Sequence, residues 1–490
     1  MEIVVRYCSF FDGQQQYIPV VLENFVKLVH HQHVRVRTRS WYLFFKFVKT
    51  LRAHVGNAAK SIIESIQDLL PITAEVPDNE ADDDMSSDES DHSADAVFTG
   101  QLYLFEAIGC VSSTSATPEA DQALYARLVM QPLFADMEAH LPQAKAGKPQ
   151  AILQVHHIVM ALGTLATGFS DYIPGQQKTR AQPPPQALSK EFENASKAIL
   201  VALNQLNESD EIRTACRSAF SRLLGVLGSA VLPLLPEWIE GLLSRSSSKD
   251  EMAMFLRLLE QVVYNFKGEI YSILDMLLTP LLQRVFIGLA EPINGTDDEI
   301  QLQEMRREYV SFVQVILIND LGGVLVSEQN QGIFQSLVTS IFEIAKNLSH
   351  GNLVASRIAF NVLSRMILQW GGPDIVTPGE NPVVTGAPAP VIPGFHQFMI
   401  EQFHGVCWAV LQDASFKPNS DAQSRQILNE IAGIEQVIYA KTGDMFLGHL
   451  QGVTFPQLGM DGTEFLRVLT TSTDRKPVVQ YLLGLLKGRR

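Results

Sequence analysis

The chain consists almost entirely of stretches in which apolar residues recur every three to four positions, and no convincing series of alternating apolar and polar residues interrupts them. A recurrence of three to four residues is the period of an amphipathic helix, whereas half-buried strands need strict alternation. We therefore expect an all-α protein whose helices follow one another in neighbouring pairs. The expected pairs are 17–31 with 35–55, 57–71 with 97–113, 119–141 with 148–173, 187–206 with 210–228, 231–245 with 249–267, 269–290 with 299–321, 332–348 with 351–371 and 394–413 with 420–442, followed by two shorter helices at 461–471 and 475–487.

The pairs recur roughly every 40 to 60 residues, the range of HEAT or armadillo units with inserted loops. Each such unit buries its apolar face only by stacking on its neighbours. We therefore expect a right-handed α-solenoid of HEAT-like antiparallel helix pairs. The second helix of several pairs opens alike, as 210–224, 352–366 and 33–45 show. In HEAT units an Asp and an Arg at such positions commonly bridge neighbouring repeats, which is a structural interpretation of Arg213 and Arg357.

Two insertions divide the array. Residues 77–96 are acidic and serine-rich with few large apolar side chains, a composition typical of disorder. Residues 373–393 are rich in Pro and Gly, which indicates an extended loop, and 170–186 form a shorter one. The expected organisation is HEAT-like repeats at 1–76, an acidic insertion at 77–96, HEAT-like repeats at 97–372, a Pro/Gly-rich loop at 373–393 and C-terminal HEAT-like repeats at 394–490.

The first residues form an apolar helical stretch, EIVVRYCSFF, with no capping residue before it. Terminal repeats of solenoids normally present a polar outer face. We therefore expect the repeats at 1–76 to be N-terminally truncated relative to a longer solenoid. That truncation would leave Ile3, Val4, Tyr7 and Phe10 on an exposed apolar face.

The charge of the chain is unevenly distributed. The formal net charge is −15, yet residues 1–60 carry nine Lys/Arg against three Asp/Glu, and residues 61–100 carry twelve acids and no Lys/Arg. The acidic total argues against nonspecific nucleic-acid binding, whereas the basic start permits a shaped anionic ligand. Cysteines are scattered without CxxC spacing, as in reduced, buried cysteines of intracellular proteins. They are Cys8, Cys110, Cys216 and Cys407.

One uncharged stretch is long enough to cross a bilayer. It contains the 22 residues between Lys148 and Asp171. Polar Gln154, His156 and His157 lie in its first part and no aromatic belt flanks it, so a buried helix is the better interpretation. We therefore expect no membrane insertion.

The stretch 33–55 combines basic and oily residues. On a helix, Arg35, Arg39, Tyr42, Lys46 and Lys49 share one face, while the large apolar residues fall on the opposite face. This face carries no compensating acid of its own. The pattern predicts an amphipathic helix with a cationic stripe, and the alternative for each cation is a solvated helix face.

Further basic residues lie on other second helices, which usually line the concave face of a superhelical array. The candidate residues for binding such an anionic ligand are therefore Arg35, Arg39, Tyr42, Lys46, Lys49, Arg213, Arg217, Arg306, Arg307 and Arg357. Tyr42 could stack on a base or ribose, and the cations could contact backbone phosphates.

Motifs of catalysis and metal binding are not found. The sequence has no GxxxxGK[ST] phosphate loop, no GxSxG, no HExxH and no paired CxxC. The histidine clusters, at 30–33 and 156–157, place neighbouring side chains about 100° apart on a helix, a poor geometry for one metal ion. We therefore expect no catalytic residue, no cofactor and no metal, and a protein that is not an enzyme.

Several segments resemble, in their amino-acid sequence and in their order along the chain, segments of the exportin-t family. This family comprises the tRNA-exporting karyopherins of the importin-beta/exportin superfamily. The segments are EIVVRYCSFF, VRVRTRSWYLFFKFVKTL, SIIESIQDLL, EMRREYVSFVQVILINDLGGVL and LSRMILQWGG. The resemblance runs in order from residue 2 to the end of the chain, outside the two insertions. It is to the C-terminal half of that family.

The resemblance implies a nuclear export receptor that binds mature tRNA by shape together with the small GTPase Ran in its GTP form. It also implies contacts with nuclear pore proteins and shuttling between nucleus and cytoplasm. The main Ran site would lie in an N-terminal half that this chain lacks. The alternative is a HEAT-repeat scaffold or protein-cargo karyopherin whose basic face binds acidic partners.

Overall fold

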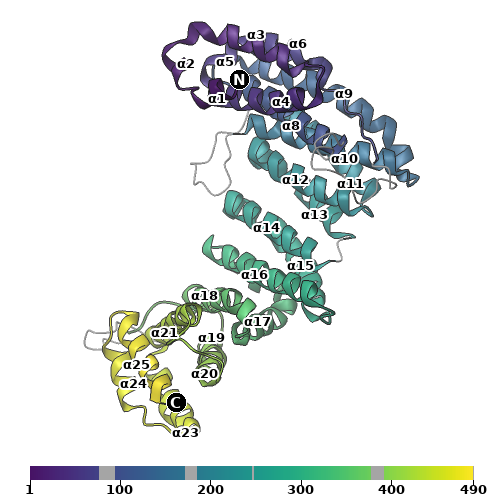
Figure 1. The fold of residues 1–490 in the computed structure, drawn as a ribbon. Helices are drawn as coiled ribbons and strands as arrows, with labels where there is room; N and C mark the ends of the chain where they lie inside the picture. The colour runs from purple at the N-terminus through teal and green to yellow at the C-terminus, as the bar shows by residue number, and fades with distance from the viewer. Residues whose placement is uncertain (77–93, 171–184, 246–247, 377–390, 489–490) are drawn as a thin grey trace. The chain divides into compact units, whose positions relative to one another are not determined.

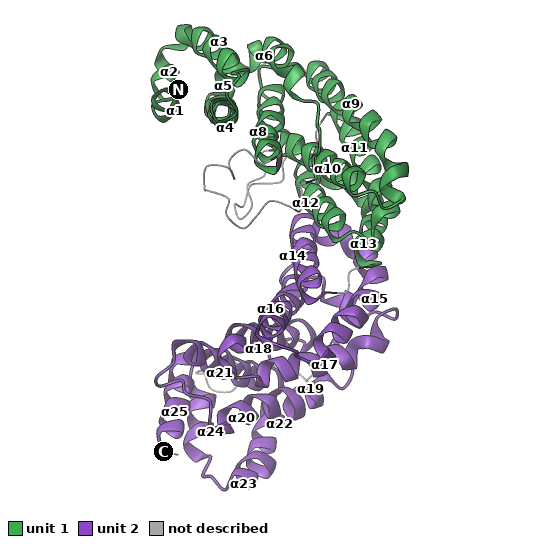
Figure 2. Ribbon diagram, turned by 45° about the vertical axis from the view of Figure 1, so that its right-hand side comes forward, with its two compact units in different colours: residues 1–246 green, residues 247–490 purple. Residues whose placement is uncertain are grey.

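The structure, a computed structural model, describes residues 1–76, 94–170, 185–245, 248–376 and 391–488. Regular structure in these ranges is helical throughout, so the prediction of an all-α protein is confirmed (Figure 1). The chain forms two compact units, residues 1–246 and 247–490 (Figure 2). Each unit is a stack of helix pairs.

In the first unit, the second helices of the pairs pack side by side in one row. The first helices are α3 (Ile18–Val29), α6 (Ala59–Ile66), α9 (Glu119–Lys145), α11 (Gln186–Leu206) and α13 (Leu235–Leu243). The second helices are α4 (Val34–Thr50), α8 (Ala94–Ser112), α10 (Pro149–Phe169) and α12 (Asp210–Leu227). Helix α4 packs on α8, α8 on α10 and α10 on α12, as the views in Figures 1 and 2 agree.

Small residues let the backbones of this row approach closely. A Cβ atom added at Gly109 of α8 would lie 2.5 Å from the carbonyl oxygen of Leu165 and 2.7 Å from the Cα of Gly168, both on α10. Large aromatic side chains fill the space between α3 and α4, where Phe25, Phe44 and Phe47 have no exposed surface. Backbone contact therefore fixes the crossing of α8 and α10 within the row, and aromatic packing joins α4 to its first helix, α3.

The second unit repeats this organisation. Its first helices are α15 (Tyr271–Ala290), α17 (Gln331–Lys346) and α20 (His404–Gln412). Its second helices are α14 (Lys249–Phe266), α16 (Thr296–Ile318), α18 (Leu353–Trp370), α21 (Ala422–Thr442) and α25 (Arg475–Gly488), each packed on the next, and α24 (Thr463–Thr471) packs against the last two.

One helical segment of this unit was not predicted. Residues 444–458 form α22 (Asp444–His449), a π-helical turn (Leu450–Thr454) and α23 (Phe455–Leu458). The glycines at 448, 452 and 459 obscure a helical pattern, since Gly is a poor helix former. Phe446 and Leu450 have no exposed surface, so tertiary packing stabilises this segment.

Where the structure describes the ends of the two insertions, regular or buried structure extends into the ranges that we assigned to them. Residues 94–96, which we assigned to the acidic insertion, begin α8, and residues 77–93 lie outside the described ranges. At the start of the Pro/Gly-rich loop, Ile375 and Val376 are buried, and both backbone N–H groups donate to the carbonyl oxygen of Ala440. Residues 377–390 and 171–184 also lie outside the described ranges.

The apolar stretch after Lys148 is a buried helix, as predicted. Helix α10 is one of three stretches long and apolar enough to cross a membrane by length and composition, the others being 210–243 and 249–290. It packs between α8 and α12. Its His157 ring stacks on Phe98, with 3.6 Å between the ring centroids, and burial beside His156 lowers the pKa of His157 to about 4.

The first residues deviate from one continuous helix. Helix α1 (Glu2–Arg6) ends before α2 (Phe10–Gly13) begins. Ile3, Tyr7 and Phe10 are 74%, 61% and 57% exposed, as the apolar pattern predicted, whereas Val4 is half-buried. The four cysteines are free and buried, also as predicted.

Candidate nucleic-acid interface

Helix α4 presents its basic side chains because its opposite side is held in the core. Trp41 is buried and its indole Nε1 donates a hydrogen bond to the carbonyl oxygen of Val29, 3.0 Å away on α3. Phe44, Phe47 and Val48 have no exposed surface. This anchoring fixes the rotation of α4 and turns the predicted stripe toward solvent.

Arg39, Tyr42, Lys46 and Lys49 form what we call the α4 surface. Lys46 and Lys49 are exposed, and Tyr42 is half-buried. The guanidinium carbon of Arg39 lies 5.3 Å from the centroid of the Tyr42 ring, and the ammonium of Lys46 lies 5.6 Å from it. Contacts of this kind hold cations near an aromatic ring and are worth about 0.5–1 kcal/mol at exposed sites.

Helix α8 completes this surface with Tyr103. Its ring packs edge-on against Tyr42, with 5.2 Å between the centroids, and stacks on Phe45 at 5.5 Å. The ammonium of Lys49 lies 5.0 Å from the Phe45 centroid. An aromatic layer therefore lies beneath the cations. Tyr42, which we predicted as a base-stacking residue, is already packed on Tyr103 and flanked by two cations.

The α4 surface has two compensating acids, so the expectation of an uncompensated stripe was wrong. The guanidinium of Arg39 pairs with Glu2 of α1 at 2.7 Å, and the ammonium of Lys49 pairs with Glu106 of α8 at 2.9 Å. The acids come from other helices and are not visible in the pattern of α4 itself. Lys46 has no ion pair among the described residues.

One of the two ion pairs of the α4 surface is weak enough to be exchanged. The side chains of Arg39 and Glu2 are 58% and 66% exposed, whereas in the other pair Lys49 is 54% exposed and Glu106 only 16% exposed. Exposed pairs of this kind typically contribute less than about 1 kcal/mol, since water screens the charges. An incoming phosphate can therefore replace the Glu2 carboxylate at little cost, whereas displacing Lys49 would leave the largely buried charge of Glu106 without a partner. Arg35, in the first turn of α4, is half-buried.

The predicted arginines of α12 are buried. One guanidinium nitrogen of Arg213 donates to the carbonyl oxygen of Asn207, 2.6 Å away at the end of α11, and another lies 3.5 Å from Asp210. Arg217 donates to the hydroxyl of Thr214 at 3.1 Å. Both side chains are only 6% exposed. These two contacts of Arg213 lie within its own helix pair, α11 and α12, so they do not show the bridge to a neighbouring repeat that we predicted.

Arg222, which we did not single out, bridges two second helices. Its guanidinium donates to the Thr164 hydroxyl of α10 at 2.6 Å, and burial lowers its pKa. The sequence contains a signal for this different role. Arg222 lies nine residues after Arg213, and this spacing places the two side chains on opposite sides of α12.

The predicted arginines of the second unit lie in different surroundings from one another. Arg307 pairs with Glu308 at 2.8 Å and with Glu304 at 3.3 Å, and Arg257 of α14 shares both acids. Arg306 points away from this network and donates to the amide oxygen of Asn352 at 3.2 Å. Arg357 is half-buried, and its Nε atom has no hydrogen-bond partner in the part of the chain that the structure describes.

A histidine, a carboxylate and a hydroxyl do meet in the second unit. The Nδ1 atom of His404 lies 3.0 Å from both Glu435 oxygens, and its Nε2 atom lies 2.8 Å from the Thr454 hydroxyl. Each of the three residues is at most 7% exposed. These hydrogen bonds join α20, α21 and the π-helical turn inside the core, where no substrate reaches the hydroxyl. Among the described residues, no three His, Cys, Asp or Glu side chains gather closely enough to hold a metal ion.

Comparison with known proteins places the chain in one family. The family model described as Exportin-T matches residues 1–490. Curated exportin-T proteins of Chaetomium globosum and Neurospora crassa are 76% and 71% identical over 490 residues, which is all of this chain and 48% of each relative. The Aspergillus clavatus protein is 51% identical over 474 residues, which is 96% of this chain and 45% of the relative.

The fold itself is that of the karyopherin solenoids. A solved structure titled importin13 in its cytosolic state superposes with a TM-score of 0.61 at 13% sequence identity, over 99% of this chain and 48% of that one. At this identity the likeness concerns the fold alone. It agrees with the predicted stack of HEAT-like pairs.

The chain spans about half the length of the curated relatives that it matches. The comparisons do not support the prediction that this half is the C-terminal one. The argument that the main Ran site is missing from this chain therefore loses its basis. The identity over the whole chain leaves no doubt about its relationship: the chain belongs to the exportin-T family.

Proposed function

We propose that the chain is part of a nuclear export receptor that carries tRNA, together with Ran in its GTP form, from the nucleus to the cytoplasm. Membership of the exportin-T family supports this proposal. Contacts with nuclear pore proteins and shuttling through the pore belong to the same proposal. The receptor hydrolyses nothing itself, and its work is binding and release.

The α4 surface is the part of the chain that we assign to the tRNA backbone, and its geometry carries the assignment. Lys46 is exposed without an ion pair among the described residues, and Arg39 is held by an exposed pair. Lys49 is itself exposed, although its partner Glu106 is only 16% exposed. A-form RNA presents phosphates and 2′-hydroxyls on a regular surface, which suits cations spaced along a helix. The rings of Tyr42 and Phe45 hold these cations in place, and Tyr103 packs against both rings.

The remaining predicted tRNA contacts have less support. Arg213 and Arg217 are buried, Arg307 shares two carboxylates with Arg257, and Arg306 faces another side of α16. Each would have to give up contacts within the protein to reach a phosphate. We therefore place Lys46, Lys49 and Arg39 first.

A double charge reversal, Lys46→Glu with Lys49→Glu, tests this assignment in the full-length receptor with Ran-GTP. We expect weaker binding of all tRNA species alike, because phosphates carry no sequence information. The dependence of log affinity on log salt should flatten by roughly 0.7–0.9 for each lost phosphate contact. Filter binding across a salt series measures both quantities.

The matched control is Lys27→Glu with Lys60→Glu. These lysines are also exposed, but they lie on the first helices α3 and α6 and pair with Glu23 and Glu64 of their own helices. The control should leave the tRNA affinity within about twofold of the wild-type value. The fold should also be retained, since isolated exposed ion pairs contribute little to stability. Unchanged affinity and salt slope in the Lys46/Lys49 variant would show that the α4 surface is only a solvated helix face.

A second function is favoured by one observation: the α4 surface already accepts two carboxylates, from Glu2 and Glu106. A scaffold or protein-cargo karyopherin could use the same cations for an acidic protein. Competition separates the two functions. Free tRNA, but not duplex DNA, should displace the ligand of a tRNA receptor, whereas both polyanions should displace an acidic protein held by charge alone.

A further inference from the structure

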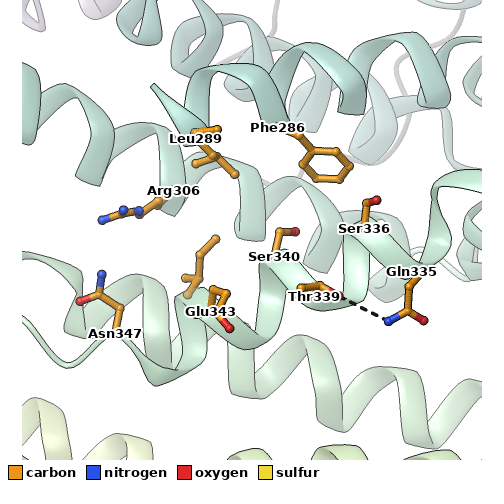
Figure 3. Close-up of a pocket in the computed structure, with 11 residues that line it drawn as sticks. Phe286, Leu289, Arg306, Gln335, Ser336, Thr339, Ser340, Glu343 and Asn347 are labelled. Carbon is orange, nitrogen blue, oxygen red and sulfur yellow. Dashed lines mark hydrogen bonds between the residues drawn. The ribbon is translucent and has the colours of Figure 1, made fainter. Parts of the chain in front are cut away.

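The second unit contains a groove that none of the functions above uses. It has a volume of about 540 Å³ and lies between α15 and α17, with one side chain from α16 (Figure 3). Such a volume is in the range of ligand pockets, which are commonly about 300–1,000 Å³. The groove belongs to the first-helix side of the unit, whereas the predicted cationic face belongs to the second helices.

One wall of the groove is apolar. Phe286 and Leu289 of α15 line it and are half-buried, whereas Ile344 of α17, which also lines the groove, is only 4% exposed. The opposite wall carries the hydroxyls of Ser336, Thr339 and Ser340 along α17 (Figure 3). Apolar side chains exposed beside a polar rim are typical of a surface that a partner covers.

Arg306 supplies a cation at one end of the groove, beside Asn347 and away from Phe286 (Figure 3). It donates a hydrogen bond to the neutral amide of Asn352, and it has no ion pair among the described residues. Burial lowers the pKa of Arg306, although the charge of Glu299 opposes this effect. A guanidinium that has lost water without gaining a carboxylate favours an incoming anion.

One acid lines the groove, and it is already paired. A carboxylate oxygen of Glu343 lies 2.7 Å from the ammonium of Lys346. The charge that is left without a partner at the groove is therefore that of Arg306. One cation beside an apolar wall does not suit a nucleic-acid backbone, which needs several cations in a row.

We propose that this groove binds a protein partner through a peptide segment that carries apolar side chains next to an acidic one. The apolar side chains lie against Phe286 and Leu289, and the carboxylate pairs with Arg306 as its missing partner. The hydroxyls of Ser336 and Thr339 can donate hydrogen bonds to the backbone carbonyls of the segment, whereas the hydroxyl of Ser340 already donates to the carbonyl oxygen of Leu337. The site is separate from the α4 surface, so the chain carries two binding surfaces of different chemistry.

Fluorescence anisotropy with a fluorescein-labelled peptide, GSLFEGSK, tests the proposal on the full chain. We expect saturable binding that weakens at least tenfold when the peptide glutamate is replaced by glutamine. The Arg306→Gln variant should cause a similar loss, and the Ser336→Phe variant, which fills the groove from an exposed position of α17, should abolish binding. Glu343→Gln should tighten binding, because it removes the negative charge nearest the site.

The control variant is Arg467→Gln, which removes an exposed arginine of α24 outside the groove and should leave the affinity unchanged. Circular dichroism melting of each variant shows whether the fold is intact, and Ser336→Phe keeps the test decisive if Arg306→Gln proves unstable. The proposal is overturned if the peptide does not bind at millimolar concentration. It is equally overturned if the glutamine peptide binds as well as the glutamate peptide, or if a folded Ser336→Phe variant binds normally.

Discussion

Replacing Gly109 with alanine tests how the row of second helices in the first unit is held together. The added Cβ atom would lie 2.5 Å from the Leu165 carbonyl oxygen, which is 0.9 Å short of the 3.4 Å at which ordinary van der Waals contact begins. Both nearest groups are backbone of α10, so neither can rotate away. The helices α8 and α10 must therefore separate.

The expected cost combines two opposing effects. Overpacking of a well-packed site typically costs about 1–3 kcal/mol, and the rigid backbone on both sides favours the upper end. Alanine in place of glycine within a helix contributes about 1 kcal/mol in the opposite direction. We therefore expect a net destabilisation of about 1–2 kcal/mol that is local to the first unit.

Native-state hydrogen exchange measures this change, because a chain of two units need not unfold in one step. Amides of α8 and α10 should exchange roughly 5 to 30 times faster in the Gly109→Ala variant. The control is Gly405→Ala in α20, where the added Cβ meets nothing within 4 Å and protection should rise slightly. Unchanged or increased protection of α8 in the Gly109→Ala variant would refute the close-approach argument.

Three further predictions concern charges and thiols. The Glu106→Gln variant should bind tRNA more tightly in the full-length receptor, because Lys49 loses its carboxylate partner, and filter binding measures the gain. The wild-type first unit should lose stability as the pH falls from 6.5 toward 4, since His157 is neutral in the folded state with a pKa of about 4 and binds a proton more readily when unfolded. A His157→Gln variant should show a smaller loss in urea titrations at these two pH values. Cys216 should resist iodoacetamide in the native chain, because complete burial raises the pKa of its thiol, and mass spectrometry before and after denaturation would reveal any labelling.

Local chemistry explains which helices could be predicted. The side chains of Ser209, Ser248 and Asp421 accept hydrogen bonds from the first turns of α12, α14 and α21, and each predicted start lies within two residues of the observed one. Such caps and the three-to-four-residue period are readable from the sequence because they involve neighbours along the chain. Residues 444–458 lack this signal, and packing around Phe446 and Leu450 decides their helical form.

The candidate site shows the same division. The sequence by itself determined that Arg39, Lys46 and Lys49 share one face of α4, since helical geometry fixes the angle between positions on one element. Only the tertiary structure decided what meets that face, because Glu2 and Glu106 lie 37 and 57 residues away from their partners along the chain. Burial of Arg213 and the position of Arg306 in a groove likewise depend on helices that are distant in sequence. Periodicity identifies the side of a helix, whereas contacts between helices determine whether a charge on that side is free, paired or enclosed.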